Sequence, residues 1–446
     1  MFQNNKILIL GFARSGYEAA KFLLNRGNTV FLTDLKTDHD ENQIKELENL
    51  GIHFVLGEHP DDLLDKSFDY LIKNPGVPID HKYVLKAKEL DIPVINEVEL
   101  AFRLLPKEKN IKFVAITGTN GKTTTTTLVY KFLLEDGKRA HLTGNIGFPL
   151  TGFLDKLQKD DIIVMETSCQ QLENLTKFNP DISVMTNLSY AHVDFFKTYE
   201  NYKRVKAKIF QNHTSKNIAI LNLENEDVMN ETKNIKSTVK YFSSKKEING
   251  CYIKDDAIYY YDEKIIDLKD VGLIGVHNYE NIMAAIMAVK ELGVKTESIV
   301  KVLKEFRGVE HRIEFVREVN GVKYYNDSKA TNIVATKTAL SAFKTPVIIL
   351  LGGLDRGHDF FELKDYMKYV KHIVALGQCR NRVEEFAKAM NIPCTNVEFL
   401  KDAVPAAVKV AEKGDTVLLS PASASWDQYE HFENRGDEFK ELVNKL

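Results

Sequence analysis

The sequence predicts an α/β protein of three domains. Short apolar runs rich in β-branched residues alternate with helical patterns of about 10 to 15 residues along the whole chain, which is typical of parallel βαβ units. The chain has 446 residues and 44% hydrophobic content, so it can bury large cores but exceeds one ordinary domain of roughly 150 residues. We therefore expect Rossmann-like first and third domains on either side of a central α/β domain.

The first domain is expected to span residues 1–105. Its strands are expected at Lys6–Leu10, Thr29–Thr33 and Tyr70–Lys73. Amphipathic stretches such as Tyr17–Asn25 separate them, as helices between parallel strands would. The charged segment Pro106–Asn110 then interrupts the apolar periodicity, so we place the first domain boundary just before it.

The central domain is expected at 106–308 and the third at 309–446. Strands of the central domain are expected at Ile111–Thr117, Asp161–Met165, Asp181–Thr186 and Asn217–Leu221. The polar patch Ser243–Asp270 predicts added hairpins or loops, and Tyr279–Leu292 predicts a helix that ends at Gly293. Strands of the third domain are expected at Val322–Tyr325, Val347–Leu351, His372–Leu376 and Thr416–Leu419.

The charge balance argues against a nucleic-acid partner. The chain carries 60 Lys and Arg residues against 63 Asp and Glu, a net charge of −3, and no block of basic residues could grip DNA or RNA. No apolar stretch approaches the roughly 18 residues of a membrane span, and Ile7–Leu10 is too short for an export signal. The four cysteines are isolated, which argues against a zinc site or disulfides. We therefore expect a soluble protein of the reducing cytoplasm.

The most informative motif lies in Phe113–Thr124, where an apolar strand runs into a glycine turn and then a helix. This layout is typical of a P-loop. Gly118 and Gly121 would let backbone N–H groups curl around a phosphate, Lys122 would reach the outer phosphates, and the Thr123 hydroxyl would hold Mg²⁺. The spacing G-x-x-G-K-T is shorter than the standard pattern, and a plain turn with a solvated lysine is the alternative. The strand before it and the helix after it favour nucleotide binding.

The first domain carries a weaker glycine signal, Gly11–Gly16, followed by Asp34 at the end of the second strand. The order is that of a dinucleotide site, but Ala13 replaces the middle glycine. NAD and another nucleotide diphosphate are equally compatible with it, and so is plain packing of a strand against a helix. The segment Asn74–Val77 either closes over such a ligand or is a simple turn.

Polar residues follow further strands of the central domain. Glu166 could coordinate Mg²⁺ beside Thr123, because a hard cation prefers carboxylate, hydroxyl and phosphate oxygens. His192, in the loop after another strand, is either a ligand or a surface histidine. The helical segment Tyr202–Phe210 is basic, and its composition does not single out one functional lysine.

Three loops of the third domain also follow strands. Tyr325–Asn332 carries Asp327 and Ser328 as candidate helix caps. Leu419–Asp427 is rich in small hydroxyl residues, and Leu351–Arg356 lies on a neighbouring strand end. Each would be an ordinary loop alone, but together they favour a site for a small anionic ligand.

Three motifs together give the chain a resemblance to the Mur ligase family: Thr117–Thr124, Asn326–Asn332 and Leu418–Gln428. The match runs along the whole length in the expected order. The first motif is shared with folylpolyglutamate synthetases. The other two, continuing to Phe432–Gly436, resemble the branch of the family that adds D-glutamate.

The resemblance implies a cytoplasmic ATP-dependent ligase of peptidoglycan precursor synthesis, which serves cell-wall formation and cell division. ATP would phosphorylate the L-alanine carboxylate of UDP-N-acetylmuramoyl-L-alanine, and the amine of D-glutamate would attack the acyl phosphate. It also implies a monomer whose partners are small molecules, without nucleic acid or membrane. The alternatives are another amino-acid-adding ligase of the superfamily, a nucleotide-dependent switch, and an NAD-dependent oxidoreductase, which would leave Lys122 without a role.

The resemblance also implies roles for individual residues. For ATP the matching positions are Gly118, Thr119, Asn120, Gly121, Lys122, Thr123, Thr124, Asn278, Asn281, Arg312 and Asp327. For two Mg²⁺ ions they are Thr123, Glu166, His192 and Lys206, with Lys206 carbamylated, and the catalytic positions are Lys122, His192 and Lys206. For the UDP-linked substrate they are Ala13, Arg14, Ser15, Gly16, Asp34, Asn74, Pro75, Gly76 and Asn145. For D-glutamate they are Lys329, Thr331, Arg356, Ser425 and Phe432. Arg356 stands where some members carry lysine, which keeps the charge and allows a bidentate carboxylate contact.

Overall fold

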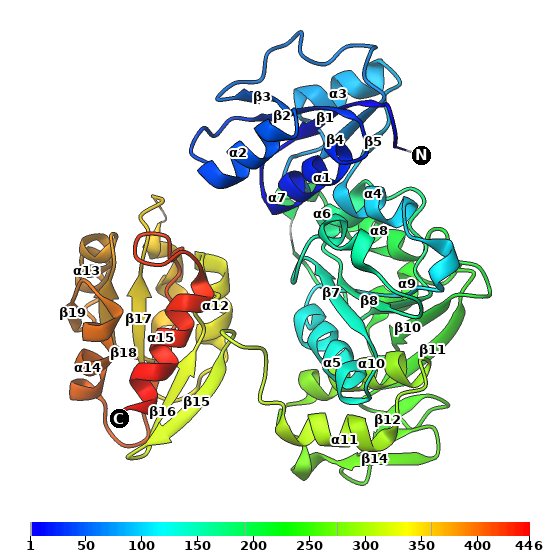
Figure 1. Cartoon of the computed structure of the whole chain (residues 1–446). Helices are drawn as coiled ribbons and strands as arrows, with labels where there is room; N and C mark the ends of the chain where they lie inside the picture. Colours follow the sequence, from blue (N-terminus) through cyan, green and yellow to red (C-terminus); the bar gives the residue numbers. More distant parts are fainter. Residues whose placement is uncertain (1, 192, 274, 358) are drawn as a thin grey trace. The chain divides into compact units, whose positions relative to one another are not determined.

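The computed structural model describes residues 2–191, 193–273, 275–357 and 359–446 (Figure 1). The chain divides into two compact units, Met1–Phe306 and Arg307–Leu446. Within the described residues the strands form three sheets, of five, nine and six strands, and the first two belong to the first unit. The predicted α/β class with three domains is confirmed. The boundary proposed between the first two domains stays a prediction, because both lie in one compact unit.

The first sheet has the strand order β3-β2-β1-β4-β5, and all of its strands are parallel. Its strands are β1 Lys6–Leu10, β2 Thr29–Asp34, β3 His53–Leu56, β4 Tyr70–Lys73 and β5 Val94–Ile95. Its helices are α1 Arg14–Leu24, α2 Glu41–Asn49, α3 Lys82–Glu89 and α4 Glu97–Arg103. The predicted strands β1, β2 and β4 are confirmed, and β3 and β5 are additions. The order reverses between β1 and β4, and in such sheets ligands bind outside the carboxyl ends of the strands at that point.

The second sheet has the order β14-β13-β12-β11-β10-β9-β6-β8-β7. Its parallel strands are β6 Lys112–Thr117, β7 Ala140–Gly144, β8 Ile162–Glu166, β9 Ile182–Met185, β10 Ile218–Asn222 and β11 Thr238–Ser243. The strands β12 Cys251–Lys254, β13 Ala257–Tyr260 and β14 Glu263–Asp267 extend it, with antiparallel pairing of β12 to β13 and of β13 to β14. The hairpins predicted in the polar patch are therefore confirmed.

Helices also pack on the second sheet, in which β6 lies between β9 and β8. They are α5 Lys122–Glu135, α6 Cys169–Glu173, α7 Val193–Phe196, α8 Tyr199–Ala207, α9 Glu226–Glu231, α10 Val276–Lys290 and α11 Thr296–Glu305. Short 3-10 helices lie at Lys107–Lys109, Leu150–Gly152, Leu154–Lys156, Lys208–Phe210 and Leu268–Asp270. Helix α5 follows β6 directly and packs against α10, the helix that was predicted at Tyr279–Leu292 (Figure 1).

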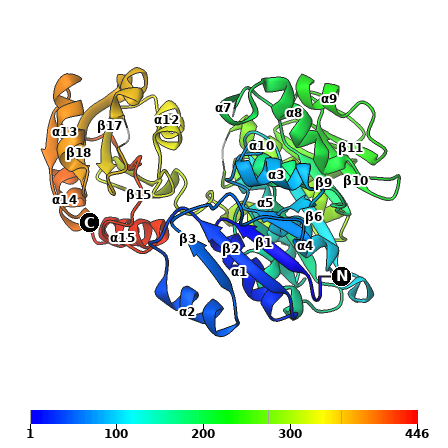
Figure 2. The same ribbon diagram turned by 90° about the horizontal axis from the view of Figure 1, so that it is seen from above.

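The second unit contains a six-stranded sheet of order β15-β16-β20-β17-β18-β19. Its strands are β15 Glu314–Val319, β16 Val322–Asn326, β17 Val347–Gly352, β18 Val370–Leu376, β19 Cys394–Asn396 and β20 Thr416–Leu419, and β15 alone among these pairs antiparallel. Its helices are α12 Ile333–Ser341, the 3-10 helix Phe360–Tyr369, α13 Arg380–Ala389, α14 Leu400–Val410 and α15 Phe432–Asn444 (Figure 2).

This sheet is covered on both faces. Ile349 and Leu351 of β17 pack with α12 and α13, whereas Ile348 and Leu350 pack with α14 and α15. Alternate side chains of a strand point to opposite faces, so a strand buried on both faces reads as a continuous apolar run. This burial is the physical reason why β17 was predictable from sequence.

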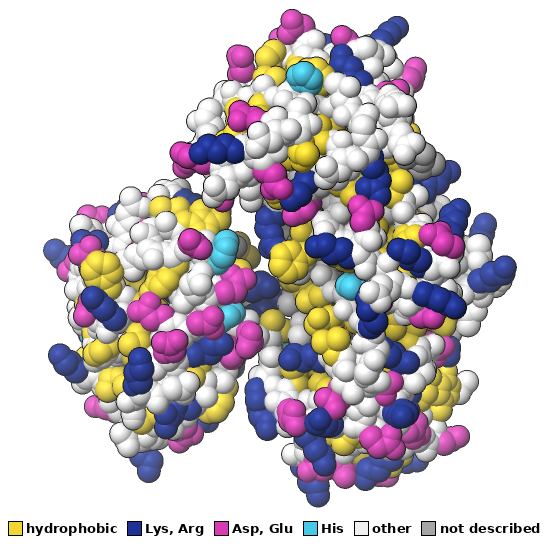
Figure 3. Space-filling model, in the orientation of Figure 1, with side chains coloured by type: hydrophobic (Ala, Val, Ile, Leu, Met, Phe, Trp, Pro, Cys, Tyr) yellow, Lys and Arg dark blue, Asp and Glu magenta, His cyan; other side chains and the backbone are white. Residues whose placement is uncertain are grey.

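The surface agrees with the near-neutral charge. On the face seen in Figure 3, basic and acidic side chains are interspersed over each unit, and the described residues there form no extended basic area. Among the residues that the structure describes, no helix has both the length and the apolar character needed to cross a membrane.

Candidate functional site

The glycine turn after β6 has the backbone of a phosphate-binding loop. Gly118 has φ of +147° and Gly121 has φ of +81°, values that favour glycine. A Cβ at Gly118 would overlap Oγ1 of Thr186, and one at Gly121 would overlap Oδ1 of Asn281. Both glycines are therefore required by conformation and by close approach, and the loop predicted from sequence is present.

The carboxyl end of β9 braces this loop. The Thr119 N–H donates to the Asn187 carbonyl at 2.8 Å, and the Asn120 N–H donates to Asn187 Oδ1 at 2.9 Å. Asn187 Nδ2 donates back to the Asn120 carbonyl at 3.1 Å, and Thr186 Oγ1 donates to the same oxygen at 2.6 Å. Asn187 was not predicted as a functional residue, and it fixes the loop through both ends of its amide.

Lys122 begins α5 and folds back over the loop. Its Nζ donates to the Gly118 carbonyl at 2.9 Å and to the Thr119 carbonyl at 2.8 Å. The ammonium group therefore lies across the turn where a phosphate would bind. Thr123 is buried behind it, and Thr124 is half-buried.

Helix α10 brings two predicted asparagines to the same region. Asn281 is buried against Gly121, and its carbonyl accepts from Thr125 Oγ1 at 3.4 Å. Asn278 lies in the first turn of the helix and is half-buried. The structure thus places Asn281 directly on the phosphate-binding loop.

A carboxylate and an amine are buried beside this loop, at the carboxyl ends of β6 and β8. Glu166, at the end of β8, is 1% exposed, and its Oε1 accepts from Asn145 Nδ2 at 2.7 Å. Its Oε2 has no hydrogen-bond partner within the described part of the chain. Lys206 of α8 is 1% exposed and donates to Thr117 Oγ1 at 3.2 Å. Burial, with repulsion from Lys122 as a smaller cause, lowers the pKa of Lys206 to about 7.

The carboxylate of Glu166 is suited to a magnesium site. An unpartnered carboxylate oxygen in a buried position is costly, and a hard cation held by carboxylate and hydroxyl oxygens would satisfy it. Among the described residues no cluster of three or more His, Cys, Asp and Glu side chains is present. The predicted ligand His192 lies outside the described residues. The observation that favours a metal is therefore the buried Oε2 of Glu166, which has no hydrogen-bond partner among the described residues.

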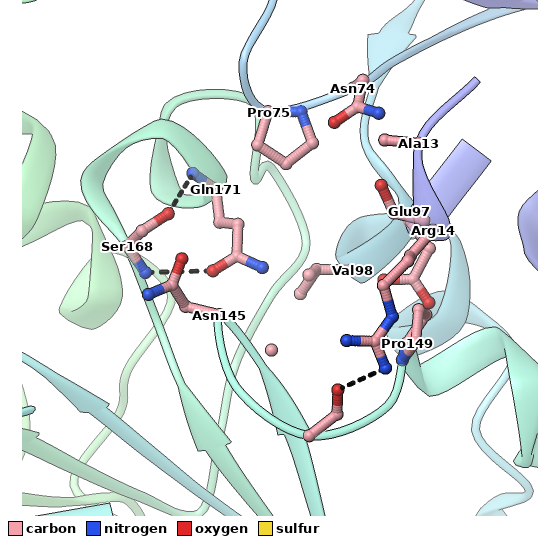
Figure 4. A pocket seen from close by; sticks show the side chains of 13 residues that line it. Ala13, Arg14, Asn74, Pro75, Glu97, Val98, Asn145, Pro149, Ser168 and Gln171 are labelled. Atoms are coloured by element: carbon pink, nitrogen blue, oxygen red, sulfur yellow. Dashed lines mark hydrogen bonds between the residues drawn. The ribbon is translucent and has the colours of Figure 1, made fainter. Parts of the chain in front are cut away.

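A pocket of about 300 Å³ lies beside this region in the first unit (Figure 4). It is lined by Ala13, Arg14, Ser15, Asn74, Pro75, Glu97, Val98, Gly144, Asn145, Gly147, Pro149, Ser168 and Gln171. The structure thus brings together the start of α1, the turn after β4 and the loop after β7, which were predicted separately. Arg14 donates to the Gly147 carbonyl at 3.2 Å, so α1 is tied to the loop after β7 across the pocket.

Three other predicted residues of the first domain do not line the pocket. Asp34 accepts from the Phe12 N–H at 2.6 Å and from the Lys36 N–H at 2.9 Å, so it holds the glycine turn before α1. Gly16 allows α1 to lie against that turn, because a Cβ there would overlap the Gly11 carbonyl. Gly76 is exposed at the tip of the turn after β4.

Several residues that line the pocket were not predicted from the sequence. Glu97 is buried, which raises its pKa to about 7, and its Oε1 accepts from Thr151 N at 2.7 Å and Oγ1 at 2.8 Å. Ser168 and Gln171 form a reciprocal capping box at the start of α6 (Figure 4). The S-x-x-Q spacing was a readable signal for that helix start. Glu97 gave no comparable signal.

In the second unit, Asp327 is the most strongly perturbed predicted residue. It is 4% exposed, and it accepts from Ser420 Oγ at 2.7 Å and from the Ile313 N–H at 3.1 Å. Burial raises its pKa to about 7, although the positive charge of Arg312 acts in the opposite direction. Arg312 and Asp327, predicted together for one ligand, are thus electrostatic neighbours.

Three of the other predicted residues of this unit take part in contacts with aromatic rings, and the remaining two lie in loops that a buried arginine joins. Nζ of Lys329 lies 5.8 Å from the centre of the Phe432 ring, and Cζ of Arg356 lies 4.5 Å from that of Trp426. Ser425 is buried, and its Oγ has no hydrogen-bond partner among the residues described. Thr331 is half-buried, just before α12.

The buried arginine is Arg435 of α15, which the sequence reasoning did not single out. It is 1% exposed and donates to Ser328 Oγ at 3.0 Å, to the Ser328 carbonyl at 2.9 Å and to the Ser423 carbonyl at 3.1 Å. It therefore joins the loop after β16 to the loop after β20, the two loops that carry Lys329 and Ser425.

Three family models match the chain. They are described as Mur ligase MurD-like, N-terminal domain over residues 5–96, Mur ligase middle domain over 116–289, and Mur ligase, glutamate ligase domain over 311–423. A protein of Enterococcus hirae named UDP-N-acetylmuramoylalanine--D-glutamate ligase is 44% identical over 100% of this chain and 97% of its own length. A protein of the same name from Bacillus subtilis (strain 168) is 44% identical over 100% and 98%.

Solved structures show the same fold at lower identity. The UDP-N-acetylmuramate-alanine ligase MurC of Thermotoga maritima has a TM-score of 0.55 and 19% identity, and 99% of each chain is covered. A pseudomurein peptide ligase type C from Methanothermus fervidus has a TM-score of 0.54 and 18% identity, with 99% of this chain and 100% of that chain covered.

Proposed function

The chain belongs to the Mur ligase family, and from this premise we propose that it adds D-glutamate to UDP-N-acetylmuramoyl-L-alanine with ATP. The observation that carries the proposal is that three features meet at the carboxyl ends of β6 and β8. A phosphate-binding loop, the unpartnered carboxylate oxygen of Glu166 and the buried amine of Lys206 lie together there. Relatives that share 44% of the sequence over its full length bear the name of this ligase.

The reaction has two steps. The L-alanine carboxylate attacks the γ-phosphorus of ATP and ADP leaves, so an acyl phosphate forms. The unprotonated amine of D-glutamate then attacks the acyl carbon, inorganic phosphate departs, and the new amide nitrogen loses a proton. Negative charge develops on the phosphoryl group in the first step, and preorganised positive groups lower that barrier. We propose that Lys122 and the backbone N–H groups of 118–124 supply them.

Lys206 is suited to carry a carbamate. A pKa of about 7 leaves much of the amine neutral near neutral pH, and the neutral amine adds to CO₂ with loss of one proton. The product is an anion in place of a cation, which suits a metal site. Bound Mg²⁺ would neutralise charge on the phosphates. We propose that it occupies two sites, and that its ligands are Thr123, Glu166, His192 and carbamylated Lys206.

The substrate sites follow from the family match and from the geometry of each unit. The pocket beside α1 would hold the UDP-linked substrate, because a helix N-terminus favours phosphate. Its proposed contacts are Ala13, Arg14, Ser15, Gly16, Asp34, Asn74, Pro75, Gly76 and Asn145. The proposed ATP contacts beyond the phosphate loop are Asn278, Asn281, Arg312 and Asp327. The proposed D-glutamate contacts are Lys329, Thr331, Arg356, Ser425 and Phe432.

We propose that the three domains are residues 1–105, 106–308 and 309–446, and that the protein acts as a cytoplasmic monomer on small molecules. The family match and the interspersed charges on the face shown in Figure 3 support the absence of a nucleic-acid role.

A phosphate-release assay with an amino-acid panel tests the proposed function. We expect release that requires both UDP-N-acetylmuramoyl-L-alanine and one amino acid, and that this amino acid is D-glutamate rather than L-glutamate, L-lysine or D-alanine. Release with either substrate missing would contradict the ligase. Preference for another amino acid would favour a different amino-acid-adding ligase of the superfamily.

A further inference from the structure

A buried lysine lies behind the turn that lines the pocket. Lys73 is the last residue of β4 and its side chain is 0% exposed. Its Nζ donates to the carbonyl of Val77 and lies 3.5 Å from each of the carbonyl oxygens of Asn74 and Pro75. The ammonium group is therefore enclosed by the turn Asn74–Val77, and it gathers three carbonyl oxygens of that turn.

A buried carboxylate lies on the other side of the ammonium group. Glu173 is the last residue of α6, its side chain is 8% exposed, and its Oε2 lies 3.8 Å from Lys73 Nζ. That oxygen has no hydrogen-bond partner in the described residues. Burial lowers the pKa of Lys73 to about 8 and raises that of Glu173, while each charge partly offsets the effect on the other. Removing one partner of such a pair leaves a buried charge uncompensated.

The two partners hold two walls of the same pocket. Asn74 and Pro75 enter it from the turn that encloses Lys73, and Ser168 and Gln171 enter it from the capped start of the helix that ends at Glu173 (Figure 4). Lys73 belongs to the first sheet and Glu173 to a helix on the second. The ion pair between them therefore links one wall of the pocket to the other.

We propose that Lys73 and Glu173 form a clasp that positions the turn Asn74–Val77 against α6 and so determines the affinity for the uridine diphosphate part of the substrate. This inference rests on the proposed function, since it takes the turn as a UDP-binding element. Lys73 is a positioning residue, because its ammonium group is enclosed by protein carbonyls and does not line the pocket. Its loss should therefore weaken substrate binding and leave the chemical step intact.

Calorimetric titration with UDP alone tests the clasp. Hydrogen bonds to a charged group contribute enough that we expect Kd for UDP to rise about tenfold in Lys73→Met. In steady-state assays, KM for the UDP-linked substrate should rise by a similar factor, while kcat and KM for ATP change less than about threefold. A lysine that only stabilised the fold would not move one KM selectively.

Lys208→Met is the matched control. Lys208 is half-buried and donates to the carbonyl of Glu173 at 2.8 Å, so the variant removes a neighbouring cation from the same helix end without touching the turn. We expect Kd for UDP to stay within about twofold of the wild-type value, because the hydrogen bond that is lost joins neither the turn Asn74–Val77 nor a residue that lines the pocket. Equal weakening by Lys208→Met and Lys73→Met would overturn the clasp.

Two further outcomes decide the inference. If Lys73→Met fails to fold, Glu173→Gln keeps the side-chain shape and removes the charge, and Kd for UDP must still rise about threefold or more. Unchanged UDP affinity in the folded variant overturns the clasp alone. Wild-type protein that does not bind UDP would instead overturn the proposed function, and the clasp with it.

Discussion

Substitution of the first glycine of the phosphate-binding loop should separate loop geometry from general stability. In Gly118→Ala the new Cβ would overlap Thr186 Oγ1 and lie 3.2 Å from both the backbone N and O of Asn187. Thr186 is 2% exposed and donates to the Asn120 carbonyl at 2.6 Å. It cannot withdraw without releasing the loop that it braces.

The expected magnitude follows from these contacts. A φ of +147° is unfavourable for alanine, and such backbone strain costs about 1 to 3 kcal/mol. Loss of the hydrogen bond from Thr186 adds roughly 1 kcal/mol. We therefore expect the free energy of unfolding to fall by about 2 to 4 kcal/mol. A displacement of the loop by about 1 Å would lower kcat/KM roughly 100-fold.

Gly137→Ala is the matched control for this prediction. Gly137 follows α5 with φ of +77°, and a Cβ there would meet no described atom within 4 Å. Alanine at position 137 should cost about 1 kcal/mol of backbone strain without displacing the phosphate-binding loop. We therefore expect kcat/KM to stay near the wild-type value. Urea unfolding and ATP-dependent phosphate release measure the two quantities. If Gly118→Ala kept kcat/KM within about threefold, the inferred role of the loop geometry would be refuted.

Three further predictions concern buried titratable groups. Glu166→Gln keeps the side-chain shape but removes the charge that would hold Mg²⁺, so phosphate release should fall by roughly 100-fold; unchanged release at limiting Mg²⁺ would contradict the metal role. Lys206→Ala should lose activity and partly regain it with an added short-chain carboxylate, whereas Lys203→Met on the same helix should need no rescue; activity of Lys206→Ala without carboxylate would argue against the carbamate. Burial raises the pKa of Asp327 to about 7, so the unfolded state ionises first and stability is lost as pH rises from about 4 to 7. The difference in unfolding free energy between Asp327→Asn and the wild type should therefore grow in favour of the variant by up to about 4 kcal/mol over that range. A difference that does not change with pH would exclude the raised pKa of Asp327.

Strands buried on both faces could be predicted from sequence. In β1, Ile7 and Ile9 pack into one cluster and Leu8 and Leu10 into another, so the run is apolar throughout. By contrast, β3 His53–Leu56 is an edge strand without a fully buried residue, and β5 Val94–Ile95 has two residues. Neither carries a period that single-sequence reasoning can distinguish from a loop.

The candidate site was predictable where the constraint is local. A phosphate-binding turn needs glycine at positions 118 and 121 because of the φ values there. The turn is therefore recognisable from the sequence alone. The brace from Asn187 to Asn120 joins residues 67 positions apart, and Arg435 reaches Ser328 across 107 positions. Such partners come into contact only through the tertiary fold, so no spacing in the sequence predicts them.

Oxygen transfer from the substrate to phosphate tests the central claim most directly. UDP-N-acetylmuramoyl-L-alanine labelled with ¹⁸O in the alanine carboxylate would be incubated with ATP, Mg²⁺ and D-glutamate. The ¹⁸O content of the phosphate and amide products would then be measured by mass spectrometry. Activation of the carboxylate as an acyl phosphate predicts one ¹⁸O atom in each phosphate released, in step with amide formation to D-glutamate. Phosphate without ¹⁸O would contradict this account of the reaction.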